Sequence, residues 1–337
     1  MVVGADIRER PGGEPAREGF IVVTGASGFV GTALCAHLRS RNLPFIGTVR
    51  KMQKGLASDL QPVGDLAQLD DAALEDVVGG AAAVVHLAGR AHVMVEAERN
   101  STRAYTEANL ELTARLVRIA ARTDVRRFIL ASSVKVNGER SRAGSPFRPK
   151  DTPNPQDAYA RSKRAAEDEL LDVAGRSAMS GVVLRLPLVY GRNAKGNFPR
   201  LVHAVVSGRR LPLASVRNRR SLVYVGNLVE AIETAILAPA TFAGVHFVAD
   251  AEAVSTPDLV RAIAVAWRVK ARLFAVPVPL LRVAGVISGR SNVVARLTES
   301  LEVDTSSFRE TTGWSPRWSL DAALSRTASQ HRGAALY

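Results

Sequence analysis

A short strand, a glycine-rich turn and a helix follow one another near the start of the chain, and this combination constrains the fold most. Residues 20–42 read FIVVTGASGFVGTALCAHLRSRN. The β-branched run at 21–23 predicts a buried strand, and the spacing of Leu34 and Leu38 predicts a helix that begins near Val30. A strand followed directly by a helix is the repeating unit of sheets with parallel strands, so an α/β fold is expected.

The alternation of strands and helices continues through the first 190 residues. Further strands are expected at 45–49, 82–89, 127–133 and 181–191, and further helices at 108–122 and 158–171. This order predicts a Rossmann-like, doubly wound parallel sheet with helices on both faces. Beyond residue 191 the alternation loosens, which indicates a smaller C-terminal substrate-binding domain.

Composition narrows the class of protein and of ligand. The chain has 337 residues and a net charge of +13, but its 45 basic residues are spread along the whole sequence and aromatic residues make up 5%. Nucleic-acid binding is therefore disfavoured, and anionic small ligands are favoured. The sequence contains no apolar run of about 18 residues, so no membrane-spanning helix is expected. The chain also begins without the apolar core of a signal peptide, so a cytoplasmic protein is expected.

A metal site is not expected. Cys35 is the one cysteine, which excludes a disulfide framework. His86 and His92 lie six residues apart without a third ligand at useful spacing, and His86 is interpreted as a packed residue before a ligand-binding loop.

The glycine turn predicts a dinucleotide site. Glycines in this context permit a tight turn and a close approach of backbone to a pyrophosphate, while the helix N-terminus supplies N–H donors. The residues assigned to this turn are Gly25, Ser27, Gly28, Phe29, Val30 and Gly31.

The end of the second strand indicates which dinucleotide is bound. An NAD site usually places a carboxylate there, whereas this strand is followed by Arg50 and Lys51. A guanidinium suits a 2′-phosphate, because its planar fork donates two parallel hydrogen bonds. NADP(H) is therefore preferred, with NAD(H) as the alternative.

Residues 157–163, DAYARSK, place Tyr159 and Lys163 four residues apart on one face of the predicted helix. Together with TGASGFVG, VGDLAQLD, HLAG and ILASS, in this order, the motif resembles the extended short-chain dehydrogenase/reductase family, in its NAD-dependent epimerase/dehydratase branch. The resemblance implies that Tyr159 is the acid/base, that Lys163 lowers its pKa and holds the nicotinamide ribose, and that Ser133 steadies the reacting oxygen. It also implies cofactor contacts at Asp65, Leu66, Leu87, Ala88, Gly89 and Pro187. The expected domains are a loose tail at 1–18, an NAD(P)-binding Rossmann domain at 19–190 to which 221–250 returns, and a substrate-binding part made of 191–220 and 251–330.

The later motifs RLPLVYGR, KGNFPRL and NRRSLVYVGNLV look like the nucleotide-sugar branch of the family. This implies that Asn197 and Arg220 meet the diphosphate of a UDP-sugar, and Lys135 is expected to reach the sugar. Dehydratases of this branch carry Asp-Glu after the catalytic hydroxyl residue, where this chain has Val134 and Lys135, so a dehydratase is disfavoured.

The motifs HLAGRAHVM and SSVKVNGE look most like bacterial 4-keto reductases that finish UDP-N-acetylquinovosamine or related 6-deoxy sugars for surface polysaccharide. The main expectation is NADPH-dependent reduction of a UDP-4-keto-6-deoxy-hexose, such as UDP-2-acetamido-2,6-dideoxy-4-hexulose, by a homodimer. Two alternatives stay open: a 4-epimerase of UDP-glucose or UDP-N-acetylglucosamine, and a non-catalytic NADP-sensing module. The apolar, proline-led run at 275–287 is expected in the core or against a partner, because it is too short to span a membrane.

Overall fold

The computed structural model describes residues 19–51, 57–90, 98–142 and 144–334, and the statements below concern these ranges. The predicted tail at 1–18 and His92 lie outside them. The chain divides into two compact units. The first contains Met1–Val136, Pro153–Arg185 and Val229–His246, and the second contains Asn137–Thr152, Leu186–Leu228 and Phe247–Tyr337.

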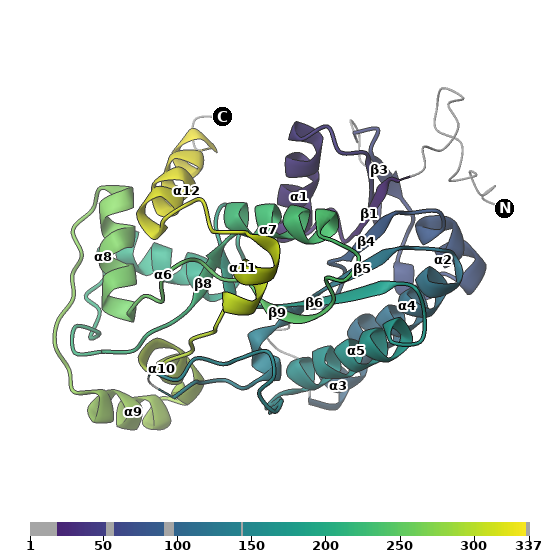
Figure 1. Ribbon diagram of the computed structural model, residues 1–337. Helices are drawn as coiled ribbons and strands as arrows, with labels where there is room; N and C mark the ends of the chain where they lie inside the picture. The colour runs from purple at the N-terminus through teal and green to yellow at the C-terminus, as the bar shows by residue number, and fades with distance from the viewer. Residues whose placement is uncertain (1–18, 52–56, 91–97, 143, 335–337) are drawn as a thin grey trace. The chain divides into compact units, whose positions relative to one another are not determined.

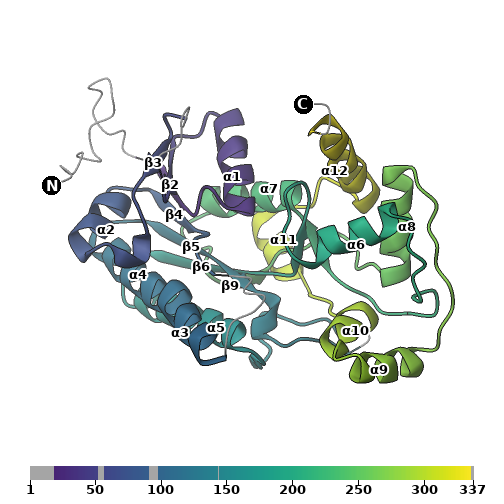
Figure 2. The same cartoon turned by 180° about the vertical axis from the view of Figure 1, so that it is seen from behind.

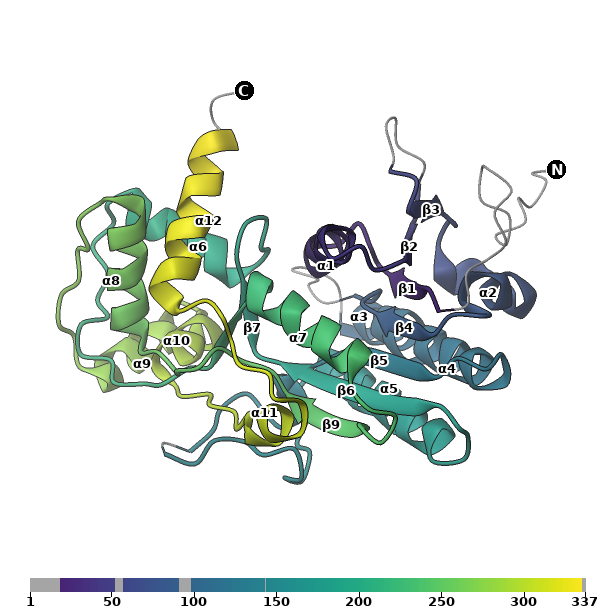
Figure 3. The ribbon, with the colours of Figure 1, turned by 45° about the horizontal axis from the view of Figure 1, so that its top comes forward.

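A seven-stranded sheet forms the centre of the first unit, with the order β3-β2-β1-β4-β5-β6-β9 (Figure 3). Its strands are β1 (Ile21–Thr24), β2 (Phe45–Val49), β3 (Leu60–Pro62), β4 (Ala83–His86), β5 (Arg127–Ser133), β6 (Ser180–Leu186) and β9 (Gly244–Phe247). The pairings from β3 through β5 are parallel, and Val22 on β1 lies opposite Ile46 on β2 and Val84 on β4. The strand order reverses between β1 and β4, so the loops after these two strands flank the point where doubly wound sheets bind ligands. The prediction of an α/β fold with a doubly wound parallel sheet is confirmed.

Helices cover both faces of this sheet (Figures 1 and 3). They are α1 (Phe29–Ser40), α2 (Asp71–Val78), α3 (Glu98–Tyr105), α4 (Leu112–Arg122), α5 (Ala158–Ala174) and α7 (Val225–Leu237). Helices α1 and α7 share one face, where Glu233 of α7 accepts from His37 at 2.6 Å and from Arg41 at 2.9 Å. Helices α2, α4 and α5 lie on the other face. The connections between these strands and helices contain three short helical segments. They are two 3₁₀ turns, Leu66–Gln68 and Val134–Val136, and a π-helical turn, Thr106–Glu111.

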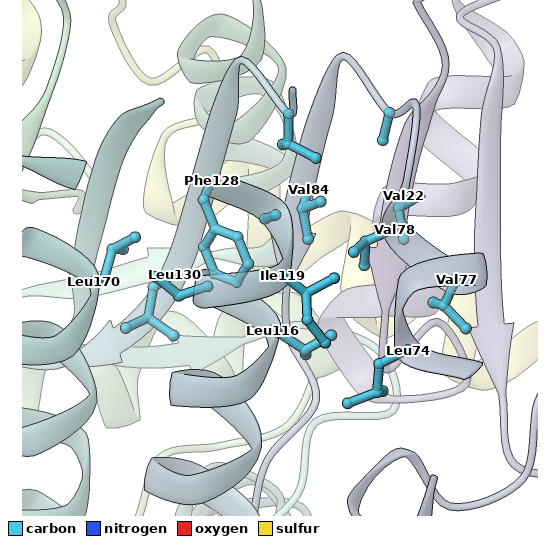
Figure 4. Close-up of a cluster of buried hydrophobic side chains, with 14 of the residues drawn as sticks. Val22, Leu74, Val77, Val78, Val84, Leu116, Ile119, Phe128, Leu130 and Leu170 are labelled. Atoms are coloured by element: carbon cyan, nitrogen blue, oxygen red, sulfur yellow. The ribbon is translucent and has the colours of Figure 1, made fainter. Parts of the chain in front are cut away.

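The main core of the first unit lies between the sheet and helices α2 and α4 (Figure 4). Leu116 and Ile119 of α4 are fully buried against Phe128 and Val84 of the strands, with exposed fractions of 1% or less. Loss of the Phe128 ring would cost roughly 3–5 kcal/mol of stability, the usual range for emptying an aromatic core position. The edge that carries the ligand loops is therefore held by a packed scaffold.

The second unit contains a two-stranded parallel sheet and six helices among its described residues. These elements are β7 (Leu188–Tyr190), β8 (Leu222–Tyr224), α6 (Asn197–Val206), α8 (Thr256–Trp267), α9 (Val278–Ile287), α10 (Ser291–Thr298), α11 (Ser306–Thr312) and α12 (Leu320–Ala334).

The prediction of a single strand over 181–191 is wrong. The segment forms β6 and β7, which belong to different sheets, and Pro187 lies between them. Proline has no N–H to donate to a sheet ladder, so the chain leaves the first sheet at this residue.

Candidate active site

The turn between β1 and α1 requires glycine at two positions. Gly25 has φ +72°, and a Cβ there would lie 2.7 Å from the Ala88 nitrogen. A Cβ on Gly31 would lie 2.2 Å from the Gly25 oxygen. The glycine turn thus packs closely against the loop after β4 on one side and against the first turn of α1 on the other.

The first turn of α1 presents free backbone donors. The helix begins at Phe29, its N-cap is Gly28, and no side chain caps it. Ser27 and Gly28 are exposed, and the first turn holds no acidic residue. An uncapped helix N-terminus behind an exposed turn fits the pyrophosphate of a dinucleotide, because the N–H groups and the helix dipole both favour an anion.

The carboxyl end of β2 adds a polar group without a partner. The Thr48 hydroxyl is buried and has no hydrogen-bond partner in the part of the chain that the structure describes. The Thr48 carbonyl accepts from the Ala26 amide at 3.1 Å, which joins β2 to the glycine turn. Arg50 and Lys51 follow the strand directly and are exposed. These groups fit a dinucleotide, and the preference for NADP(H) stays a prediction.

The other residues assigned to cofactor binding differ in whether their side chains are exposed to a ligand. Asp65 is exposed, and its carboxylate accepts from the Ala67 amide at 3.2 Å. Leu66 is buried in the core, so only its backbone is available for a ligand. The segment 87–89 follows β4, and Pro187 follows β6 within the second unit. The cofactor contacts of all these residues stay predictions.

His86 is a structural residue at the end of β4. Its Nδ1 lies 2.7 Å from the Thr24 hydroxyl and its Nε2 lies 3.1 Å from the Thr113 hydroxyl. Burial, and secondarily the charge of Lys163, lowers the pKa of His86 to about 3, so the ring is neutral. The Thr24 hydroxyl also accepts from the Ala88 amide at 3.2 Å, which ties the loop after β4 to β1. Within the described residues no group of three or more His, Cys, Asp or Glu can hold a metal ion.

Asn109 is a site residue that the sequence did not reveal. It lies in the π-helical turn, where its Oδ1 accepts from the Arg90 amide at 2.8 Å and its Nδ2 donates to the Arg90 carbonyl at 3.1 Å. The same Nδ2 donates to the Ser162 hydroxyl at 3.0 Å, and Ser162 donates to the Tyr159 carbonyl at 2.8 Å. Asn109 therefore holds the loop after β4 against the helix that carries Tyr159. A buried amide in an otherwise apolar helical run was the available signal.

The three residues assigned to catalysis come together at the carboxyl end of β5. Ser133 is the last residue of that strand, and its hydroxyl shares a hydrogen bond with the Tyr159 side chain. The buried Lys163 ammonium donates to the Ala131 carbonyl at 2.8 Å. The Tyr105 ring packs edge-on against Tyr159, with 5.8 Å between the ring centroids. This arrangement places a phenol, a hydroxyl and an ammonium at the edge where the ligand loops lie.

In the chain by itself burial, and not Lys163, is the main influence on the pKa of Tyr159, and the expected lowering of this pKa by Lys163 and a bound nicotinamide stays a prediction. Burial raises the pKa of the Tyr159 phenol to about 12, and the hydrogen bond with Ser133 opposes this only in part. Burial also lowers the pKa of Lys163 to about 8, against the attraction of Glu167. Removal of both groups from water favours their neutral forms, and this effect exceeds that of their neighbours.

A buried ion pair joins the helix that carries Tyr159 to the sheet. Glu167 of α5 is 0% exposed and Arg185 of β6 is 1% exposed, and Arg185 Nη2 lies 2.6 Å from Glu167 Oε2. The Ser132 hydroxyl donates to the same carboxylate. Removing one partner of such a pair leaves an uncompensated buried charge, so this contact fixes α5 against β5 and β6.

Lys135 contacts the N-terminus of α5, the helix that carries Tyr159. Its ammonium lies 2.7 Å from Asp157 Oδ2, while Asp157 Oδ1 accepts from the Ala160 amide at 2.7 Å as the N-cap of α5. Burial alone would raise the pKa of Asp157, but the hydrogen bonds from Lys135 and Ala160 bring it below its ordinary value. The structure thus gives Lys135 a positioning contact, and its expected reach to the sugar stays a prediction.

The residues assigned to the UDP group lie in the second unit. Asn197 is exposed at the first position of α6. Arg220 donates to the Glu299 carbonyl at 3.0 Å, and burial lowers its pKa. Its neighbour Arg219 pairs with Glu302 at 2.9 Å, and Arg217 is exposed.

The chain is similar to a known protein family over more than half of its length. The model of the NAD dependent epimerase/dehydratase family matches residues 21–249. A UDP-glucose 4-epimerase from Vibrio cholerae is 38% identical over 310 residues, which is 91% of this chain and 94% of that protein. The chain belongs to the NAD dependent epimerase/dehydratase family. This membership confirms the resemblance to the extended short-chain dehydrogenases/reductases.

Proteins of lower sequence identity are also similar to this chain. An N-acetyl-α-D-glucosaminyl-diphospho-ditrans,octacis-undecaprenol 4-epimerase from Escherichia coli O157:H7 is 28% identical over 63% of this chain and 62% of that protein. Among solved structures, a UDP-N-acetylglucosamine 4-epimerase from Bacillus cereus has a TM-score of 0.75 at 19% identity, covering 94% of this chain and 97% of the other. MoeE5 in complex with UDP-glucuronic acid and NAD has a TM-score of 0.75 at 23% identity, covering 94% and 100%. At these identities the structures confirm the fold. No helix among the described residues is both long and apolar enough to cross a membrane.

Proposed function

We propose that the chain is a UDP-hexose 4-epimerase that uses a retained NAD. The convergence of Tyr159, Ser133 and Lys163 at the sheet edge that also carries the glycine turn supports the reaction class, because it sets a proton donor and acceptor where a dinucleotide would bind. The similarity to the Vibrio cholerae 4-epimerase along 91% of the chain favours epimerisation over a one-way reduction. A homodimer in the cytoplasm belongs to the same proposal.

The proposed chemistry divides between the cofactor and the chain. Bound NAD supplies a hydride acceptor that later returns the hydride. Tyr159 takes the proton of the C4 hydroxyl as that carbon is oxidised and gives it back when the ketone is reduced on its other face. Ser133 donates a second hydrogen bond to the same oxygen. Lys163 holds the nicotinamide ribose, and its positive charge, with that of the nicotinamide, favours the phenolate of Tyr159.

A second candidate is the NADPH-dependent reduction of a UDP-4-keto-6-deoxy-hexose in surface polysaccharide (O-antigen) biosynthesis. Arg50 and Lys51 favour it, because they directly follow β2 where an NAD site usually places an acid. A reductase consumes NADPH from solution, and a cation at this position would bind the 2′-phosphate of NADPH. A non-catalytic sensor is disfavoured, because it has no use for the hydrogen-bonded pair of Tyr159 and Ser133.

The bound nucleotide and the activity of the purified protein distinguish the two candidate functions. For an epimerase we expect stoichiometric NAD(H) to be released on denaturation, and UDP-glucose or UDP-N-acetylglucosamine to be interconverted with its 4-epimer without added cofactor. Little bound nucleotide, no epimerisation, and rapid NADPH oxidation with a UDP-4-keto-6-deoxy sugar would instead support the reductase. The absence of both activities would overturn the proposal.

Arg50 tests the cofactor separately. In Arg50→Glu, a like charge would face a 2′-phosphate, and the ratio of NADPH to NADH affinity should shift towards NADH by about 1–3 kcal/mol if Arg50 binds that group. Arg209→Glu, which makes the same change of charge at an exposed position of the second unit, is the control. A wild type that prefers NADH and an unchanged ratio in Arg50→Glu would exclude the 2′-phosphate role and leave the NAD-dependent epimerase.

A further inference from the structure

The helices α9 and α10 expose large aliphatic side chains. The exposed fractions are 59% for Leu280, 56% for Val283, 70% for Val286, 82% for Ile287 and 50% for Val293. These five residues are called the α9–α10 apolar face. They account for five of the nine large hydrophobic residues that are exposed in the described chain, although α9 and α10 are short helices.

The apolar face is separate from the side of α9 that packs within the unit. Leu280, Val283 and Ile287 have the spacing i, i+3, i+7, which places them along one side of the helix. On another side Gly285 is buried, and a Cβ there would lie 2.8 Å from Val294 of α10. Figures 1 and 2 show α9 and α10 side by side. A helix that is apolar on two sides is ordinarily covered on both, so a partner is expected on the exposed side.

The segment of the sequence that contains this face is basic, which favours an anionic partner. Residues 268–298 contain no Asp or Glu and six basic residues. These are Arg268, Lys270, Arg272, Arg282, Arg290 and Arg296. Glu299 follows directly, and its carboxylate lies 3.8 Å from Arg282. A second copy of the chain would bring the same cations together in a symmetric contact, which disfavours self-association through this face.

The kind of side chain indicates a lipid surface. The apolar face is entirely aliphatic, whereas the cores of protein interfaces are enriched in aromatic residues and Met. A nucleic acid offers no apolar surface to cover such a face. Exposed aliphatic residues on one side of a short helix, in a segment that also carries exposed arginines (Arg290 and Arg296), are typical of segments that lie in the interface of an anionic bilayer.

We propose that the α9–α10 apolar face docks the protein on the surface of an anionic phospholipid bilayer. Leu280, Val283 and Ile287 enter the boundary between headgroups and acyl chains, and Arg290 and Arg296 contact the phosphates. The helices lie on the membrane without crossing it. This surface is an addition to the proposed reaction and does not depend on it.

Vesicle co-sedimentation of the full chain tests this docking. We expect binding to vesicles of phosphatidylglycerol and phosphatidylethanolamine, much weaker binding to phosphatidylcholine vesicles, and a loss of binding at high salt. Ile287→Asp should weaken binding on the order of tenfold or more. The control is Val265→Asp on α8, where Val265 is 77% exposed outside the face, and it should bind like the wild type.

The electrostatic part is tested by Arg290→Glu, with Arg309→Glu on α11 as the control of equal charge change. Only the first should weaken binding. Equal binding of Ile287→Asp and the wild type, or no binding to anionic vesicles, would overturn the proposal. Sedimentation velocity without lipid gives a separate answer: if Ile287→Asp converts an oligomer of the wild type into a smaller species, the face is a contact between copies and the lipid proposal is wrong.

Discussion

At Tyr159, burial and hydrogen bonding act on the phenol in opposite directions. Burial is the larger effect, and it raises the pKa to about 12 from an ordinary value near 10. The phenol therefore carries its proton throughout the neutral range, which suits the step that protonates an alkoxide. To act as a base, Tyr159 needs a cationic charge beside it. Lys163, with a pKa lowered to about 8, is protonated at neutral pH, and we expect it to supply this charge together with a bound nicotinamide.

Tyr159→Phe should lower turnover on the order of 10²-fold or more, because the variant lacks the group that exchanges the proton. NAD(H) affinity should change little. Tyr105→Phe is a matched control, since it removes a phenol hydroxyl from the neighbouring ring and preserves the edge-on contact. Steady-state kinetics and cofactor titration of both variants provide the test. Near-normal turnover in Tyr159→Phe would show that another group is the acid.

His86 links the pH of the solution to the stability of the first unit. Its folded pKa of about 3 lies below the ordinary value of 6.5, so between these values the unfolded chain binds a proton that the folded chain does not. The free energy of unfolding should therefore fall as the pH drops below about 6.5, by up to about 1.4 kcal/mol per pH unit from this residue.

Replacement of His86 by Asn removes the titration. We expect His86→Asn to be destabilised at neutral pH, because it loses ring packing, and the difference from the wild type to shrink from about pH 7 to about pH 5. Urea unfolding across this range measures it. A difference that stays constant with pH would mean that the His86 ring titrates normally in the folded protein.

Among the elements, α5 carries both Tyr159 and Lys163, and the contacts at its N-terminus set where they lie. Asp157 caps the helix at the Ala160 amide and also holds Lys135. In the same unit Asp70 caps α2 in the same way, with its Oδ1 2.8 Å from the Ala73 amide. Both carboxylates thus cap a helix at the third residue after them, but only Asp157 caps the helix that carries Tyr159.

Asp157→Ala and Asp70→Ala should each cost about 1 kcal/mol of stability, the usual value for the loss of an N-cap. Only Asp157→Ala should also lower turnover, on the order of ten- to a hundredfold, because it shifts the turn that carries Tyr159. Thermal unfolding and kinetics on the two variants test this. Equal turnover in both would mean that the cap stabilises α5 without positioning the phenol.

The sequence predicts a strand or a helix best where a local pattern of apolar residues is sufficient to specify it. The strand expected at 127–133 has the same bounds as β5, and the helix expected near Val30 is α1. The strand expected at 181–191 is interrupted at Pro187, which cannot donate to the sheet. The prediction missed this break because apolar residues continue on both sides of the proline. Contacts between side chains far apart in sequence leave no periodic signal. The pair of Lys135 with Asp157 and the bonds of Asn109 to Arg90 therefore appear only in the fold.

For the molecule as a whole, the two units carry different parts of the proposed reaction. The first contains the glycine turn, Ser133, Tyr159 and Lys163, and the second contains Asn197 and Arg220. If this division is right, substitutions in the two units should change different kinetic constants. A change at the reacting oxygen lowers kcat, whereas a change at a group that binds a remote part of the substrate raises KM.

Arg220→Ala is the test of this division. Burial of the guanidinium makes each hydrogen bond that it donates more valuable, so its loss should raise KM for a UDP-sugar on the order of tenfold or more, with a smaller change in kcat. Free UDP should compete with the substrate in the wild type and lose potency in the variant. Arg219→Ala, which removes an exposed arginine paired with Glu302, is the control and should leave KM nearly unchanged. If UDP does not compete and simple ketones are reduced as readily as UDP-sugars, the assignment of the diphosphate to Arg220 is wrong, while the roles of Tyr159 and Ser133 are unaffected.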